Sequence, residues 1–150
     1  MSITDTLQQT KASSSSMALA TTVQKNLALE NIALELESNV KGILKANQQD
    51  LTSAINGGVS QSLQDRLMLD EKRIHALAAA VRVIKQLPDP IGDSVRGMKL
   101  ENGLQVSQVR VPFGVIGCIY EARPNVTVDI ASLAIKSGNA AVLRGGSAAE

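Results

Sequence analysis

The chain has 150 residues, of which 15 are Lys or Arg, 14 are Asp or Glu, one is Cys and one is His. A domain of this length can bury roughly 68–70% of its unfolded surface, so a core without cross-links is possible. One cysteine excludes an internal disulfide, and Cys118 and His75 are too few to form a structural zinc site. A net charge of +1 with both signs interspersed argues against binding to duplex nucleic acid or to an anionic membrane.

No segment is typical of a membrane anchor or a secretory signal. The longest nearly apolar run, 111–120, is interrupted by Pro112, Gly114 and Gly117. It is too short to cross a hydrocarbon layer of about 30 Å. The first sixteen residues contain no basic stretch that leads into an apolar one. We therefore expect a reducing, cytoplasmic setting.

The first ninety residues have the apolar spacing of helices. We expect a helix over 5–20, where the serine run 13–16 weakens the pattern. The next helix has Thr21 or Thr22 as its N-cap, followed by a stripe with intervals of three and four residues that contains Leu27, Leu29, Ile32, Ala33, Leu36 and Val40.

Two further helices are predicted before residue 90. One covers 40–55 and ends at Gly57 and Gly58, because glycine suits a left-handed helix end. The other starts at an Asp70 cap and runs to Leu87, where prolines 88 and 90 end it.

After residue 92 the pattern indicates a β-hairpin. Strands are predicted over 96–101 and 104–111, joined by Asn102 and Gly103 as a two-residue loop, since both residues tolerate positive φ. An isolated hairpin is marginally stable in water, so this one is expected to lie against a neighbouring subunit.

The last forty residues indicate a strand, a helix and a strand. The run 115–120 is continuously apolar, as in strands that are buried on both faces of a parallel sheet. A polar turn, 121–125, leads to a helix over 126–137 with a glycine C-cap, and 140–144 is the second strand. A right-handed βαβ unit is expected, with another helix starting after residue 145.

Two loops follow the predicted strands, at the edge where parallel sheets bind ligands. The first holds Glu121, Arg123 and Asn125, and an ordinary solvated loop is the alternative. The second, Arg144 to Ser147, combines a cation with Gly145 and Gly146 and suits a phosphate or a ribose edge. A plain glycine turn is the alternative there.

Three other features argue for structural roles. Gly114 and Gly117 precede and enter the strand, so the usual dinucleotide fingerprint is missing. Cys118 has only apolar neighbours, which favours an unreactive core thiol over a nucleophile. His75 lies between Ile74 and Ala76 on a predicted helix, and a catalytic role is disfavoured.

The residues around these loops resemble a known family. Residues 110–129 read RVPFGVIGCIYEARPNVTVD, followed by AIKSGN at 134–139 and VLRGGS at 142–147. They closely resemble the gamma-glutamyl phosphate reductase (glutamate-5-semialdehyde dehydrogenase) family of the aldehyde dehydrogenase superfamily. Weaker matches at 44–50, 65–70 and 87–90 follow in the same order, so the resemblance covers nearly the whole chain.

The resemblance implies an α/β, aldehyde-dehydrogenase-like fold in three parts. Residues 1–92 are the N-terminal helical segment of the cofactor domain, and 93–111 are an oligomerisation β-hairpin. Residues 112–150 are the first βαβ unit of a parallel, Rossmann-like NADP-binding sheet. The hairpin at 96–111 implies a homo-oligomer.

The implied activity is NADPH-dependent reduction of L-glutamyl 5-phosphate to L-glutamate 5-semialdehyde and phosphate, in proline biosynthesis. In the family the nucleophilic cysteine lies far downstream of Arg144, so the 150-residue chain alone is expected to be inactive. No metal ion is expected. The alternatives are a non-catalytic assembly module and a related reductase that acts on another activated acyl group.

The resemblance also assigns roles to residues. Tyr120, Glu121 and Ala122 match the strand-end loop along the cofactor, and Arg144 with Gly145, Gly146 and Ser147 matches the loop near the adenosine ribose. An arginine at 144 could hold a 2′-phosphate bidentately. Asn125 resembles the asparagine that donates to the oxyanion, and Arg123 is expected to meet the substrate phosphate.

Overall fold

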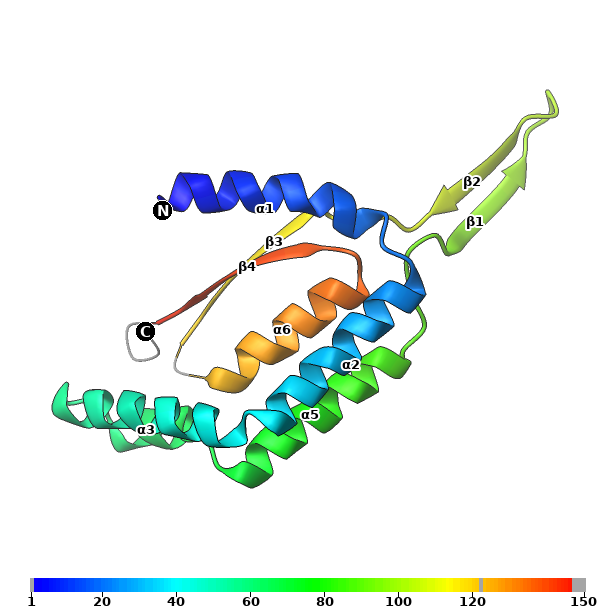
Figure 1. Cartoon of the computed structure of the whole chain (residues 1–150). Helices are drawn as coiled ribbons and strands as arrows, with labels where there is room; N and C mark the ends of the chain where they lie inside the picture. The colour runs from blue at the N-terminus through cyan, green and yellow to red at the C-terminus, as the bar shows by residue number, and fades with distance from the viewer. Residues whose placement is uncertain (1, 122, 147–150) are drawn as a thin grey trace.

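A computed structural model describes residues 2–121 and 123–146 of the chain (Figure 1). Within them the elements are, in order, α1 (Ile3–Ala18), α2 (Thr22–Ser38), α3 (Val40–Asn56), α4 (Gln61–Leu67), α5 (Glu71–Gln86), β1 (Ser94–Lys99), β2 (Gln105–Val109), β3 (Val115–Tyr120), α6 (Pro124–Lys136) and β4 (Ala140–Gly145). The predicted α/β fold with an antiparallel hairpin and a parallel pair of strands is confirmed.

The elements form layers around the β3–β4 pair. Figure 1 shows α1 on one side of this pair and α6 on the other, with α2 and α5 beyond α6. The β1–β2 hairpin projects away from the layers. None of the described helices combines the length with the apolar character that crossing a bilayer requires.

The predicted caps fix where α2 and α5 begin. The Thr21 hydroxyl accepts a hydrogen bond from the backbone of Gln24, whose side chain bonds back to the Thr21 amide, which completes a capping box. The Asp70 carboxylate accepts from the Arg73 amide at 2.6 Å. Both caps were predicted from the sequence, and both are confirmed.

The core lies between α2, α5 and α6. Leu29 and Ala33 of α2 and Ala78 and Val81 of α5 are buried together, and partly buried residues of α6 pack against them. Leu27 is 59% exposed, so it lies off the predicted stripe. Burying this stripe, at about 25 cal/mol per Å² of apolar surface, is what stabilises the helical layers.

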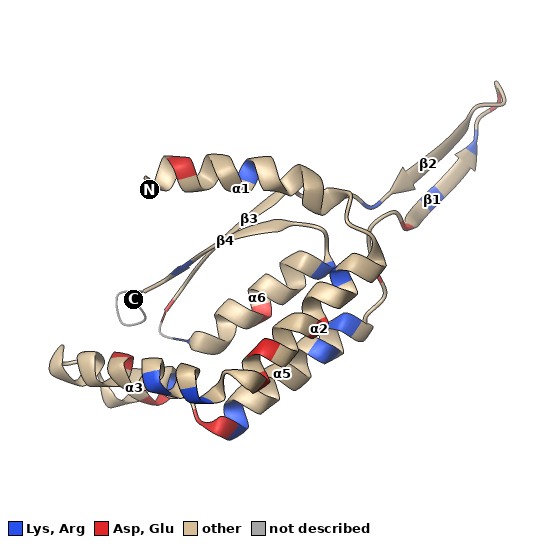
Figure 2. Cartoon of the chain, viewed as in Figure 1, with Lys and Arg blue, Asp and Glu red and all other residues tan. Residues whose placement is uncertain are grey.

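An ion-pair cluster borders this core at the outer side of α2 and α5. Arg82 contacts Glu37 at 2.6 Å and Glu30 at 3.0 Å, and Lys85 contacts Glu30 at 2.8 Å. Hydrogen bonds from Lys85 and Arg82 lower the pKa of Glu30, and the bond from Arg82 lowers that of Glu37. Figure 2 shows both signs of charge intermixed on α2, α3 and α5.

Helix α4 was not predicted. It has only seven residues, too few for an apolar period to be visible, and its Leu67 is 1% exposed against Ala54 of α3. The buried Asn47 holds its end in place: the side-chain amide donates to the Leu67 carbonyl at 2.8 Å and accepts from the Leu69 amide at 2.8 Å.

The hairpin forms as predicted, but the prediction of a two-residue loop is wrong. Gly103 has φ +87°, whereas no non-glycine residue in the described chain has positive φ. The Gly103 amide bonds to the Leu100 carbonyl and the Leu100 amide to the Leu104 carbonyl. The connection is therefore a three-residue loop, residues 101–103, in which only the glycine position requires positive φ. Every residue of β1 and β2 is exposed.

The β3–β4 pair is parallel and in register from Val115 opposite Ala140 to Tyr120 opposite Gly145. The prediction that both faces of β3 are buried is wrong, since Ile119 is 85% exposed. The reason is that α1 and α6 lie mainly against β4. The predicted glycine cap of α6 is present: Gly138 has φ +69°, and the buried Asn139 accepts from the Gly114 amide at 2.9 Å. The helix expected after residue 145 falls on 147–150, outside the described residues.

Two buried lysines connect neighbouring elements: Lys25 joins α2 to the turn before the hairpin, and Lys136 joins α6 to α2 and α5. Lys25 contacts Asp89 at 2.6 Å, and the Lys136 ammonium donates to Asn26 and to the Lys85 carbonyl. Burial disfavours the ionised Asp89, but hydrogen bonds from Lys25 and Thr22 outweigh it and lower the pKa of the carboxyl. Burial lowers the pKa of Lys136.

Candidate functional site

The two predicted loops meet at the carboxyl edge of the sheet. Tyr120 and Gly145, the last residues of β3 and β4, are paired. A Cβ at Gly146 would lie 3.6 Å from the Glu121 Cα and 3.7 Å from the Tyr120 carbonyl oxygen. The backbone at Gly146 therefore lies directly beside the residues that follow β3, at ordinary van der Waals distance for a Cβ. Ala122 and Ser147, which were predicted in these loops, lie outside the described residues.

Tyr120 connects the end of β3 to α6. Its side chain is half-buried, and its hydroxyl forms a hydrogen bond with the hydroxyl of Thr127 in α6. This bond holds the ring of Tyr120 against α6.

Asn125 was predicted in a polar turn, and this is wrong. Helix α6 begins at Pro124, a residue favoured at the first helical position, and Arg123 is the N-cap. Asn125 is thus in the first turn of α6, where its amide nitrogen lies 3.4 Å from a carboxylate oxygen of Asp129. Both Arg123 and Asn125 are exposed.

Arg144 lies one residue before the end of β4, opposite Ile119, and is exposed. It stands at the same edge of the sheet as Tyr120 and Gly146. The structure therefore gathers the described members of both predicted loops at one edge.

A cavity of about 380 Å³ opens beside this edge, between the α4–α5 region and α6. The residues that line it are Arg66, Met68, Leu69, Arg73, Ala76, Leu77, Ala80, Asn125 and Asp129. Arg66 also lies 3.9 Å from the Glu121 carboxylate in the strand-end loop. No role for Arg66 or Arg73 was predicted from the sequence. The only signal was the match at residues 65–70, which contains Arg66.

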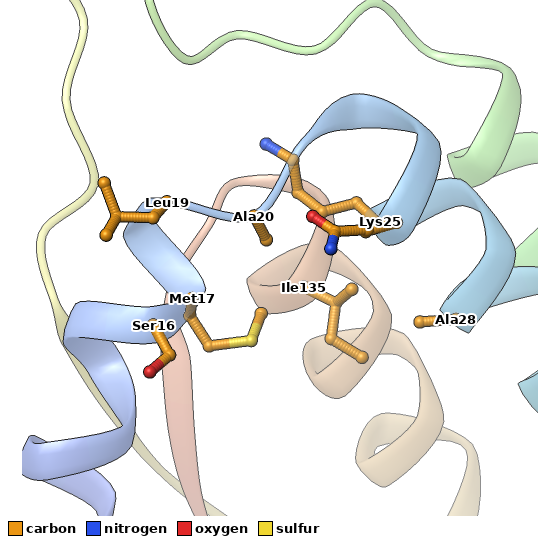
Figure 3. A pocket seen from close by; sticks show the side chains of 8 residues that line it. Ser16, Met17, Leu19, Ala20, Lys25, Ala28 and Ile135 are labelled. Atoms are coloured by element: carbon orange, nitrogen blue, oxygen red, sulfur yellow. The ribbon is translucent and has the colours of Figure 1, made fainter.

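A larger cavity of about 540 Å³ lies elsewhere, between the end of α1, the start of α2, and α6 (Figure 3). Met17 and Ile135 point into it from opposite sides. Its one charged side chain, Lys25, is already paired with Asp89. It is remote from the carboxyl ends of β3 and β4, and its lining offers few polar groups for the predicted reaction.

The other candidate groups lie apart from this edge. Cys118 is a free, half-buried cysteine in the middle of β3. His75 lies on the exposed side of α5, with its Nε2 3.8 Å from Glu71. No cluster of three His, Cys, Asp or Glu side chains that could hold a metal ion occurs in the part of the chain that the structure describes.

Comparison with known proteins identifies the family. No family model matches the chain. The chain is 56% identical over 143 residues to the gamma-glutamyl phosphate reductase of Clavibacter michiganensis, which covers 95% of the chain and 33% of that protein. It is 51% identical over 146 residues to the Aliivibrio fischeri protein of the same name, which covers 97% of the chain and 35% of that protein. The chain belongs to the gamma-glutamyl phosphate reductase family.

Solved structures agree with this family. The gamma-glutamyl phosphate reductase of Thermotoga maritima superposes with a TM-score of 0.91 at 44% identity, over 95% of this chain and 34% of that one. The Saccharomyces cerevisiae protein superposes with a TM-score of 0.90 at 31% identity, over 99% of this chain and 38% of that one. The chain therefore spans about a third of the length of the curated reductases that it matches.

Proposed function

We propose that the chain is the N-terminal part of an NADPH-dependent reductase that converts L-glutamyl 5-phosphate to L-glutamate 5-semialdehyde and phosphate in proline biosynthesis. The observation that carries the proposal is the meeting of the 120–121 and 145–146 backbones at one sheet edge. Family membership supports the reaction, since the matched relatives are named for it. The nucleophilic cysteine of this reaction is expected outside the 150 residues.

The edge of the sheet is proposed to hold the cofactor. Tyr120, Glu121 and Ala122 would lie along it, and the loop from Arg144 to Ser147 would hold its adenosine end. An exposed guanidinium at Arg144 suits a 2′-phosphate, because arginine can donate two parallel hydrogen bonds to phosphate oxygens. A contact between Arg144 and the 2′-phosphate would favour NADPH over NADH, which lacks this phosphate. The nicotinamide supplies the hydride that reduces the acyl group.

The first turn of α6 is proposed to serve the acyl phosphate. Asn125 would donate a hydrogen bond to the oxyanion that forms when the acyl carbon is attacked. Arg123, exposed at the N-cap of the same helix, would meet the phosphate that leaves. Both side chains start from one rigid element, which suits the orientation that such a step requires.

The three predicted parts of the chain have matching roles in the proposal. Residues 1–92 form the helical segment of the cofactor domain, 93–111 the assembly arm, and 112–150 the first βαβ unit. The apolar side chains of the hairpin, such as Met98 and Val106, are exposed at 40% and 41%, which supports contact with a second subunit. A cytoplasmic homo-oligomer is the proposed state.

The test uses a full-length reductase in which these 150 residues replace the matching segment of the Clavibacter michiganensis relative. We expect NADPH to form from NADP⁺ only when L-glutamate 5-semialdehyde and inorganic phosphate are both present. The parent reductase is the positive control, and circular dichroism checks that the hybrid is folded. A folded hybrid without this activity, beside an active parent, would contradict the proposal.

A further inference from the structure

The cavity beside the sheet edge has charges of opposite sign on facing elements. Arg66 of α4 and Asp129 of α6 both line it, and most of the remaining lining is apolar. Its volume of about 380 Å³ is typical of a small-molecule site, for which pockets of about 300–1,000 Å³ are usual. A cation and an anion in one apolar cavity fit a small zwitterion, such as the α-amino acid group.

Of the two arginines, Arg66 has the weaker described contacts. The Arg73 guanidinium already donates to the carbonyls of Asp65 and Met68, at 3.3 and 2.5 Å, and so holds the end of α4. The contact of Arg66 with Glu121 is 3.9 Å long, and the two side chains are 46% and 67% exposed. Exposed pairs of this kind contribute about 0–1 kcal/mol, so a bound carboxylate could replace Glu121 at little cost.

Asp129 is similarly able to accept another donor. It is half-buried, and its one described side-chain hydrogen bond, from Asn125, is long at 3.4 Å. A carboxylate accepts several hydrogen bonds, so one from an ammonium group can be added. Asp129 lies four residues after Asn125, about one helical turn farther from the strand ends.

We infer that this cavity binds the amino acid end of the substrate, with Arg66 on the α-carboxylate and Asp129 on the α-ammonium group. The inference rests on the proposed function, because the substrate must be a glutamyl compound. Asn125, one turn closer to the strand ends, then faces the acyl group. Arg66 and Asp129 are specificity residues: they hold the part of the substrate that does not react.

The test measures kcat/KM in the same full-length reductase, in the direction that consumes aldehyde and phosphate. Three aldehydes are compared: L-glutamate 5-semialdehyde, glutarate semialdehyde, which lacks the ammonium group, and γ-aminobutyraldehyde, which lacks the carboxylate. The variants are Asp129→Asn, Arg66→Gln and, as a control, Lys72→Gln on the exposed side of α5. Each comparison is a ratio between two substrates of one variant, so a loss of folded protein cancels.

We expect Asp129→Asn to lower kcat/KM for the semialdehyde about 10- to 100-fold, as for a lost charged hydrogen bond, and to leave that for glutarate semialdehyde unchanged. Arg66→Gln should lower the values for both carboxylate substrates and spare γ-aminobutyraldehyde. Equal losses for all three aldehydes would overturn the inference, as would no loss. If the unsubstituted reductase has no phosphate-dependent activity with any aldehyde, the proposed function itself fails, and the inference with it.

Discussion

Replacing Asn47 with alanine tests how the chain places Arg66. Asn47 is 5% exposed and uses both ends of its amide to hold the segment that follows α4. The Asn47→Ala variant would leave the Leu67 carbonyl and the Leu69 amide without these partners. The end of α4, which carries Arg66, would then lose its fixed position against α3.

The expected loss of stability follows from these two hydrogen bonds. Each has a net value of about 1 kcal/mol, and a buried group left without a partner costs about 1–3 kcal/mol. Alanine is the better helix former, which returns up to about 0.7 kcal/mol. The partly buried Leu69 amide takes the lower figure of about 1 kcal/mol and the Leu67 carbonyl about 1–3 kcal/mol, so the free energy of unfolding should fall by about 1.3–3.3 kcal/mol.

Equilibrium urea unfolding of the chain, followed by circular dichroism, measures this difference. Gln48→Ala is the matched control, since Gln48 is the exposed neighbour of Asn47 on α3. The control should be neutral or slightly stabilising. If Asn47→Ala cost no more than the control, the two bonds would not hold α4 in place, and the reasoning about Arg66 would lose its support.

Four further substitutions have definite expected outcomes. Gly138→Ala should lower the unfolding free energy by about 1–2 kcal/mol in the same urea assay, because φ at Gly138 is +69° and the new Cβ would lie 3.1 Å from Pro112. Gly42→Ala should raise the unfolding free energy by about 1 kcal/mol, because Gly42 lies inside α3 with open space around its Cα. Because the pKa of Asp89 is lowered in the folded state, its stabilising effect is complete above the ordinary value of 3.8 and is lost as the pH falls through the folded-state pKa. In urea unfolding at stepped pH, Asp89→Asn should be less stable than the parent near neutrality, and the difference should shrink below about pH 4. A difference that stays constant with pH would refute this. Cys118→Ser should leave the turnover of the full-length reductase nearly unchanged, and a complete loss of turnover would show that the thiol is catalytic.

Sequence patterns predicted well those elements that local chemistry determines. The caps at Thr21 and Asp70 and the glycine end of α6 follow from side-chain and backbone preferences within a few residues. The parallel strand pair followed from a short apolar run on each side of a helix. Each of these signals is contained in the segment that it describes.

The misses concern tertiary contacts and short segments. Helix α4 is too short to show a period, and its place depends on Asn47, which is 20 residues from Leu67 in the sequence. The exposure of Ile119 depends on which strand the helices cover, and this is not a property of β3. The hairpin loop was wrong because Asn-Gly also occurs in three-residue loops, where only the glycine needs positive φ.

One part of the candidate site could be predicted from the sequence, and the other part could not. The strand-end loops were predictable because the carboxyl ends of parallel strands share one edge. The cavity with Arg66 and Asp129 was not, because it forms only when α4 and α5 pack beside the first turns of α6. Because α6 starts at Pro124, Asn125 lies on the wall of that cavity and not in the predicted polar turn.

The most direct test of the cofactor-edge proposal is the KM for NADPH and for NADH in the full-length reductase with Arg144→Ala. We predict that the KM for NADPH rises about tenfold or more, as for the loss of a charged hydrogen bond, while the KM for NADH stays unchanged. Lys72→Ala on the exposed side of α5 is the control and should alter neither KM. An equal rise for both cofactors, or none for NADPH, would contradict the placement of the 2′-phosphate at the end of β4.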